Sequence, residues 1–68
     1  MNITFIGGGN MARAIIGGLL AKGFAPETIG VVEVIPEARE RLQRDLGVRC
    51  FASPAQAAPF GDLIVMAV

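Results

Sequence analysis

The sequence predicts an α/β fold in which helices cover a parallel sheet. Short apolar, β-branched runs alternate with segments of helical periodicity from the first residues onward. A glycine triplet, Gly7-Gly8-Gly9, joins the first of these strands to the first helix. Alternating strands and helices form parallel sheets with right-handed crossovers. A glycine turn after the first strand is typical of the Rossmann-type sheet, so we expect the strand order 3-2-1-4.

The first strand is predicted over Ile3–Ile6 and the first helix over Asn10–Lys22. Asn10 has a side chain suited to cap the helix. An apolar stripe predicts the helix face that lies on the sheet, and it consists of Ala12, Ile15, Ile16, Leu19 and Leu20. The pair Gly17-Gly18 lowers helix propensity. We therefore expect these two small residues to admit a closely packed neighbour.

The same signals give the later elements. Further strands are predicted over Thr28–Val34, Val48–Phe51 and Leu63–Val68; a second helix begins at Pro36 and ends at Gly47, and Ser53-Pro54 opens a short third helix. The last strand has no polar residue and would lie at the sheet edge, where an uncovered apolar strand promotes aggregation. We therefore expect residues 1–68 to be an incomplete dinucleotide-binding domain, the N-terminal fragment of a longer protein.

Composition narrows the classes of function. Six basic and six acidic residues cancel, which argues against nucleic-acid and membrane partners. Uncharged runs are shorter than the roughly 18 residues of a membrane span, and the N-terminus lacks the basic region of a secretory signal, so we expect a cytoplasmic protein. Cys50 is the only cysteine and there is no histidine, so we interpret Cys50 as a small buried hydrophobe. We assign no catalytic and no metal-binding residue.

Gly7-x-Gly9-x-x-Ala12 matches the dinucleotide-binding fingerprint with alanine at the third small position. The first glycine permits the sharp exit from the strand, the second lets a pyrophosphate approach the backbone, and the third position must be small where helix and strand cross. Free N–H groups and the helix dipole can then hold a diphosphate without a nearby cation. A Walker-type loop is excluded because no Gly-Lys-Ser/Thr follows. A plain structural turn remains the alternative.

Glu33 lies about 20 residues after the glycine turn, where the fingerprint places an acid that binds the adenosine ribose hydroxyls. A carboxylate there would repel a 2′-phosphate, which favours NADH. Arg39 and the start of the second helix could instead hold that phosphate, which favours NADPH. Glu33 could also be a solvated strand end that contacts no ligand. The sequence leaves NADPH or NADH open.

Two stretches carry a resemblance to a known family. Ile6-Gly7-Gly8-Gly9-Asn10-Met11-Ala12-x-Ala14, followed by Ile16-Gly17-Gly18-Leu19, resembles the N-terminus of pyrroline-5-carboxylate reductase. Asp62–Val68 is similar to the fourth strand of that family, which continues into Lys-Pro. The resemblance extends over the whole chain, which corresponds to the front of such an enzyme.

The resemblance implies the last step of proline biosynthesis, in which NAD(P)H reduces the ring C=N of the small-molecule substrate 1-pyrroline-5-carboxylate to give L-proline. It also implies a C-terminal helical domain, absent from this chain, that binds substrate and forms a homo-oligomer. The fragment alone would not catalyse this reaction. Carried over to this sequence, the resemblance implies that the pyrophosphate is bound by Ile6, Gly7, Gly8, Gly9, Asn10 and Met11. It also implies that Glu33 binds the adenosine ribose and that Ala67 and Val68 line the nicotinamide side. Many family members have small hydroxyl residues where this chain has Glu33, so Glu33 departs from their pattern.

Other functions remain open at this stage. β-Hydroxyacid dehydrogenase relatives share the glycine turn, although they usually continue it with Met-Gly rather than Asn-Met-Ala. A non-catalytic dinucleotide-sensing module and a structural domain without a ligand are further alternatives.

Overall fold

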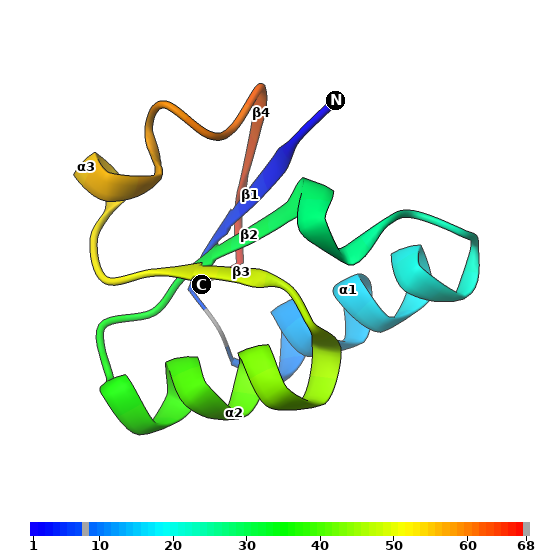
Figure 1. Ribbon diagram of the computed structural model, residues 1–68, viewed down its shortest axis with the longest axis horizontal. Coiled ribbons are helices and arrows are strands. Elements are labelled where there is room, and N and C mark those ends of the chain that lie inside the picture. Colours follow the sequence, from blue (N-terminus) through cyan, green and yellow to red (C-terminus); the bar gives the residue numbers. More distant parts are fainter. Residues whose placement is uncertain (8, 68) are drawn as a thin grey trace.

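The computed structural model describes residues 1–7 and 9–67, and four parallel strands form its sheet (Figure 1). They are β1 (Ile3–Ile6), β2 (Ile29–Val32), β3 (Arg49–Phe51) and β4 (Leu63–Met66). The order is β3-β2-β1-β4, which confirms the predicted 3-2-1-4 sheet. The predictions for Gly8 and Val68 lie outside the described residues.

Three strands are shorter than predicted, and the smallest difference is in β3, which begins at Arg49 instead of Val48. Thr28 belongs to a 3₁₀ turn, η1 (Pro26–Thr28), and the chain leaves β2 after Val32. All four β2 residues are buried, as expected for a central strand covered on both faces. At the other end of the chain, β4 stops at Met66, so Ala67 follows the strand instead of belonging to it.

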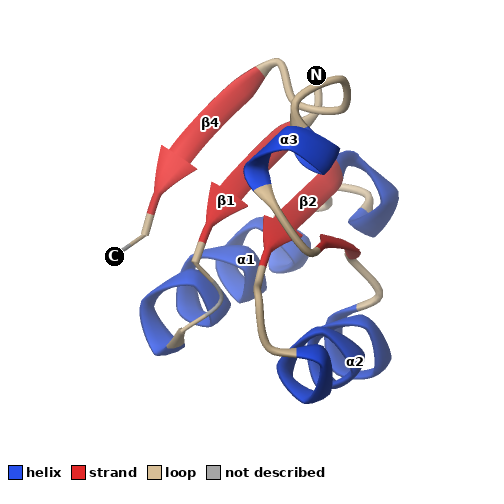
Figure 2. Cartoon of the chain, turned by 90° about the vertical axis from the view of Figure 1, so that its left-hand side faces the viewer, coloured by secondary structure: helices blue, strands red, loops and turns tan. Residues whose placement is uncertain are grey.

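The helices cover the sheet unequally. Figure 2 shows α1 (Asn10–Ala21) and α2 (Pro36–Leu46) on one face and the short α3 (Pro54–Ala57) on the other. The core lies under α1 and α2, where strand side chains of one face meet the two helices; its buried members are Ile3, Phe5, Ala12, Ile16, Ile29, Val31, Leu42, Val48 and Ala67. Leu19 and Leu20 pack against this core, but Ile15 is 41% exposed, so the apolar stripe of α1 is narrower than predicted.

The helix ends follow the sequence signals with one exception. In α2, Pro36 occupies the first turn and Gly47 closes the helix with a φ of 71°. In α3, Ser53 Oγ accepts a hydrogen bond from the Gln56 backbone N–H, as expected of an N-cap. The prediction for Asn10 was wrong: Gly9 is the N-cap of α1, without a side-chain hydrogen bond, and Asn10 is already helical.

The expected close neighbour of Gly17 and Gly18 is also not found. An added Cβ at either position would meet no atom of the described chain within 4 Å. Their place on α1 explains this result, because the core contacts of that helix are made by other residues, with Ala12 and Ile16 fully buried. Within the described residues, small side chains at 17 and 18 are therefore not required by packing.

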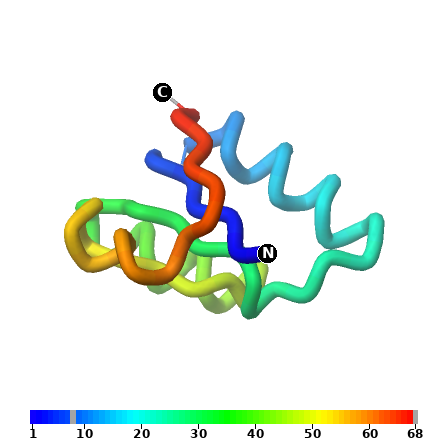
Figure 3. Tube along the Cα trace, turned by 90° about the horizontal axis from the view of Figure 1, so that it is seen from above, coloured from blue at the N-terminus to red at the C-terminus, as the bar shows by residue number. Residues whose placement is uncertain are grey.

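The sheet face that carries α3 is only partly covered. Figure 3 shows β4 beside β1, with α1 and α3 on opposite sides of these strands. A pocket of about 220 Å³ opens between β1, β4 and α3, and its walls are formed by Thr4, Ile6, Pro54, Ala57, Ala58, Gly61 and Ile64. Thr4 Oγ1 is buried there and has no hydrogen-bond partner in the described structure. Ile64, which lines the pocket, is 59% exposed, and Met66, two residues further along β4, is 65% exposed.

Candidate dinucleotide-binding site

The carboxyl ends of the parallel strands meet at one edge of the sheet. Ile6 at the end of β1 pairs with Val32 of β2 and with Met66 of β4. The residue that follows each of two strands is hydrogen-bonded to the end of the neighbouring strand. Gly7 N donates to Val32 O at 3.0 Å, and Ala67 N donates to Ile6 O at 3.0 Å. The glycine turn, the residue after β2 and the residue after β4 therefore lie together, at the edge where open parallel sheets bind ligands.

The glycine turn has the backbone geometry that the fingerprint requires. Gly7 has a φ of 100°, a backbone conformation that residues other than glycine rarely adopt. Gly9 has an ordinary φ of −74°, and a Cβ on it would meet no described atom within 4 Å. The space next to Gly9 is therefore open. Gly9 O accepts the first intrahelical bond, from Arg13 N at 3.1 Å.

The N-terminus of α1 is suited to an anion. The first N–H groups of a helix have no partner within the helix. In α1 no side chain caps them and no acidic residue lies in the first turn. The dipole of this 12-residue helix is thus left uncompensated at the open side of the glycine turn. These residues fit a pyrophosphate held by backbone N–H groups, and the ligand contacts of Gly7 and Gly9 stay predictions.

The neighbouring residues of the turn differ in exposure. Ala12 is fully buried, in agreement with the small residue expected where helix and strand cross. Asn10 and Met11 are exposed at the start of α1, and Ile6 is half-buried. Ala67 is buried at the end of β4. The ligand contacts of Ile6, Asn10, Met11 and Ala67 stay predictions.

Glu33 lies in the turn from β2 to α2 and is not a free strand end. Its Oε2 accepts a hydrogen bond from Ile35 N at 3.2 Å, and its backbone N donates to Phe51 O at 2.9 Å. The same turn is bound by Arg39, whose Nη1 donates to Glu33 O at 2.9 Å and to Val34 O at 3.1 Å. Sequence reasoning considered Arg39 as a solvated charge or a phosphate ligand and missed this contact. The one sequence signal for it is an arginine in the first turns of α2.

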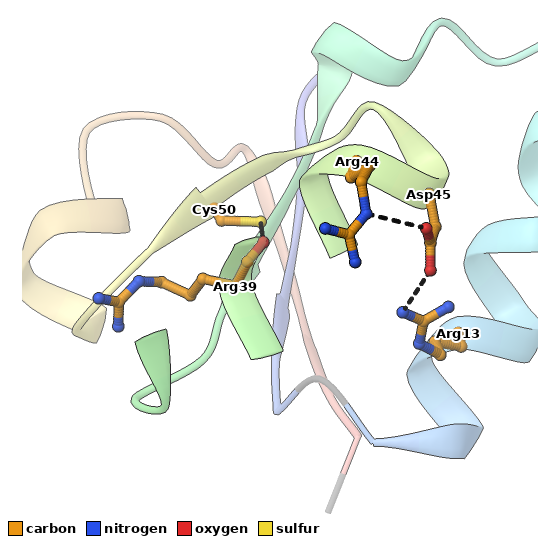
Figure 4. A network of polar contacts seen from close by, with 5 residues as sticks. All are labelled: Arg13, Arg39, Arg44, Asp45 and Cys50. Atoms are coloured by element: carbon orange, nitrogen blue, oxygen red, sulfur yellow. Dashed lines mark hydrogen bonds and ion pairs between the residues drawn. The ribbon is translucent and has the colours of Figure 1, made fainter. Parts of the chain in front are cut away.

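Cys50 and its surroundings carry no catalytic arrangement. The thiol is half-buried, and its Sγ donates to Arg39 O at 3.5 Å (Figure 4). Burial raises the pKa of the Cys50 thiol, while the charge of Arg39 opposes that rise. A thiol with a raised pKa is a poor nucleophile at neutral pH. Cys50 packs against the core, which agrees with its interpretation as a small hydrophobe, but it is half-buried and not fully buried as predicted.

Two arginines make ion pairs on the helix side of the molecule. Arg13 of α1 reaches Asp45 of α2 at 3.3 Å, and Arg44 lies 3.8 Å from the same carboxylate (Figure 4). The Arg13–Asp45 contact joins the two helices across the face of the sheet. Exposed pairs of this kind contribute little stability, in the range of about 0–1 kcal/mol.

Over residues 1–7 and 9–67, the structure contains neither a metal-binding cluster nor a membrane-spanning helix. No cluster of three or more His, Cys, Asp or Glu side chains is arranged to hold a metal ion. No helix there has both the length and the apolar character needed to cross a membrane.

A parallel 3-2-1-4 sheet, a positive-φ glycine at the end of β1 and an uncapped helix behind it define a dinucleotide-binding domain of the Rossmann type. Comparison with known proteins agrees. The chain belongs to the family described as NADP oxidoreductase, coenzyme F420-dependent, whose model matches residues 2–68. This is a family of nicotinamide-dinucleotide oxidoreductases.

The most informative relatives are reductases. The chain is 39% identical over 66 residues to pyrroline-5-carboxylate reductase of Vibrio alginolyticus, a match that covers 97% of this chain and 24% of that protein. It is also 39% identical over 67 residues to the Escherichia coli enzyme of the same name, covering 97% and 25%. A solved pyrroline-5-carboxylate reductase from Coxiella burnetii superposes with a TM-score of 0.90 at 42% identity, covering 98% and 25%. The chain thus spans about a quarter of the length of these relatives.

Proposed function

We propose that this chain is the cofactor-binding part of a reductase that converts 1-pyrroline-5-carboxylate to L-proline. The observation that carries the proposal is the similarity to reductases of this name along almost the whole chain, in both sequence and structure. The open N-terminus of α1 supports it, because a reductase of this kind must hold a dinucleotide at that place. When bound, the nicotinamide supplies the hydride that the C=N carbon of the substrate accepts.

The residues of this chain would bind and orient the cofactor. Backbone N–H groups of Gly9, Asn10 and Met11 bind the pyrophosphate, with Gly7 turning the chain and Gly9 leaving room. Glu33 binds the adenosine ribose, and Ala67 and Val68 line the nicotinamide side. No acid is assigned here to protonate the nascent amine. We place that group, the substrate contacts and the subunit contacts of a homo-oligomer in a helical domain that follows this part of the protein.

The cofactor we propose is NADH in preference to NADPH. The carboxylate of Glu33 can accept hydrogen bonds from both ribose hydroxyls, whereas a 2′-phosphate would bring like charges together. Arg39 is the nearest candidate to offset that repulsion. Its Nη1 is already engaged by two backbone carbonyls.

The test uses the intact protein. Nicotinamide absorbance is followed with 1-pyrroline-5-carboxylate, with NADH and NADPH in parallel, and L-proline is measured as the product. We expect oxidation of both cofactors with a higher kcat/KM for NADH. Reactions without the imine give the background rate. A folded protein that binds dinucleotide but oxidises neither cofactor would contradict the reductase assignment and favour a β-hydroxyacid dehydrogenase or a dinucleotide-sensing module.

A further inference from the structure

We propose that Arg39 is a positioning residue of the cofactor site, which holds Glu33 in place for the adenosine ribose and thereby sets the preference for NADH. The inference rests on the proposed function in so far as a dinucleotide binds at this edge of the sheet. It differs from the usual role of an arginine near this position, which is to bind a 2′-phosphate directly.

The turn between β2 and α2 needs an external donor. Its three residues, 33–35, connect Val32 of β2 to Pro36 of α2. The carbonyl oxygens of Glu33 and Val34 follow the end of β2 and precede α2. Neither the sheet nor the helix therefore supplies them with a backbone hydrogen-bond donor. Arg39 supplies both through one nitrogen, at 2.9 Å and 3.1 Å from Nη1. The guanidinium thus closes the turn from within the following helix.

Glu33 is held at three points, one of which is the contact with Arg39. Its N–H is bound to Phe51 O of β3, its carbonyl oxygen to Arg39, and its Oε2 to the N–H of Ile35. Within the described chain, the second carboxylate oxygen, Oε1, has no hydrogen bond. An ionised carboxylate accepts hydrogen bonds through both oxygens. Oε1 is therefore free to accept from a ribose hydroxyl while Oε2 keeps the side chain oriented.

Arg39 is itself well seated for this task. It lies in the first turns of α2 and is half-buried, and its own carbonyl oxygen accepts the hydrogen bond from Cys50 Sγ. Figure 4 shows its side chain extending away from α2, on the opposite side from the pair formed by Arg44 and Asp45. While Nη1 keeps the two carbonyls, only the remaining donors of Arg39, on Nη2 and Nε, could bind a 2′-phosphate.

The two roles predict opposite effects on cofactor binding. In a positioning role, removal of Arg39 frees Glu33 and weakens NADH more than NADPH. In a phosphate-binding role, removal weakens NADPH more than NADH. The preference between the two cofactors therefore decides between the roles, and it can be measured by binding alone.

The experiment measures dissociation constants for NADH and NADPH by fluorescence titration of the intact protein and its Arg39→Met variant. We expect the constant for NADH to rise about tenfold and that for NADPH to change less than about twofold. In turnover, the loss appears in KM for NADH rather than in kcat. Arg39→Lys, which keeps a donor for both carbonyls, should recover most of the affinity. In a Glu33→Gln background, Arg39→Met should have little further effect on NADH.

Arg44→Met is the matched control, because it removes the same charge from the same helix at a side chain that is 73% exposed and distant from the turn. It should leave both constants unchanged. A larger loss for NADPH, an equal loss for both cofactors, or an equal effect of Arg44→Met would each overturn the proposal. If dinucleotide binding follows the expected pattern but the imine is not reduced, the proposed reaction fails while this inference stands.

Discussion

Gly7 and Gly9 meet different requirements of the same turn. Gly7 has a φ of 100°, so the backbone itself demands glycine. Gly9 has a φ that any residue adopts, and a side chain there would meet no described atom within 4 Å. The fold therefore requires glycine at position 7, whereas at position 9 glycine leaves space for a ligand.

Gly9→Ala and Gly7→Ala separate these requirements. For Gly9→Ala we expect a free energy of unfolding within about 0.5 kcal/mol of the wild type, but NADH binding at least about tenfold weaker, because the methyl group fills the pyrophosphate space. For Gly7→Ala we expect a loss of about 1–3 kcal/mol from backbone strain. Urea unfolding and NADH titration measure the two effects. Unchanged NADH binding by Gly9→Ala would contradict a pyrophosphate at this turn.

Cys50 gives a pH-dependent prediction. Burial raises its pKa above the ordinary value of 9.0, so the folded state holds the thiol proton more tightly than the unfolded state. This contribution to stability is fully present below pH 9.0 and is lost as the pH rises through the folded-state pKa. The free energy of unfolding of the wild type should therefore fall relative to that of Cys50→Ala above about pH 9, with a constant difference near about pH 7. A difference that stays constant into the alkaline range would refute the raised pKa.

At the scale of elements, α1 and α2 differ in how their N-termini are completed. In α2 the first turn contains Pro36, which has no N–H to satisfy, and Glu37, whose charge complements the dipole. In α1 the N-cap is Gly9, and the first turn contains no acid. α2 also lacks a side-chain cap, but its first turn has one N–H fewer and contains an acidic residue, so the N-terminus of α1 is the more favourable of the two for an anion. The contrast supports our proposal of an anion site at α1.

Gly18 gives a prediction for the stability of α1. It is exposed within the helix, and an added Cβ would meet no described atom within 4 Å. Gly18→Ala should therefore raise the free energy of unfolding of the 68-residue chain by about 0.5–1 kcal/mol, since alanine loses less backbone entropy. Thermal unfolding followed by circular dichroism measures this gain. Gly23→Ala is the control with the opposite sign, because Gly23 has a φ of 99°. A loss of stability for Gly18→Ala would indicate an unseen packing partner.

At the scale of the whole molecule, the two sides of the sheet are unequally protected. The face under α1 and α2 contains the core, whereas next to α3 the side chains of Ile64, which lines the pocket, and of Met66 are exposed. β4 is also an edge strand, with unpaired backbone groups on its outer side. In the described sheet, exposed apolar side chains and an open edge occur on the same strand.

We expect the 68-residue chain to self-associate through β4. Ile64→Lys should shift sedimentation toward the monomer, because a charged residue on an edge strand disfavours strand pairing. Val34→Lys introduces the same charge at another exposed apolar side chain, 71% exposed but outside the sheet, and should have little effect. Equal effects of the two variants would mean that association depends on net charge and not on β4.

The sequence by itself determined the elements and the chemistry of the backbone site. Alternation of strands and helices, Gly7 at the turn and Pro36 and Gly47 at the ends of α2 are local signals, and the structure agrees with each. They could be predicted because helix ends, positive φ and periodicity depend on residues close in sequence.

Only the tertiary structure decided the contacts between distant or competing groups. Gly9 and not Asn10 is the N-cap of α1. Gly17 and Gly18 lie next to open space, and Arg39 binds backbone carbonyl groups. The lengths of β2 and β4 also depend on pairing with the neighbouring strands of the sheet. This pairing ends where the neighbouring strand ends. Such outcomes depend on three-dimensional geometry and on competition between partners, and a linear pattern contains neither.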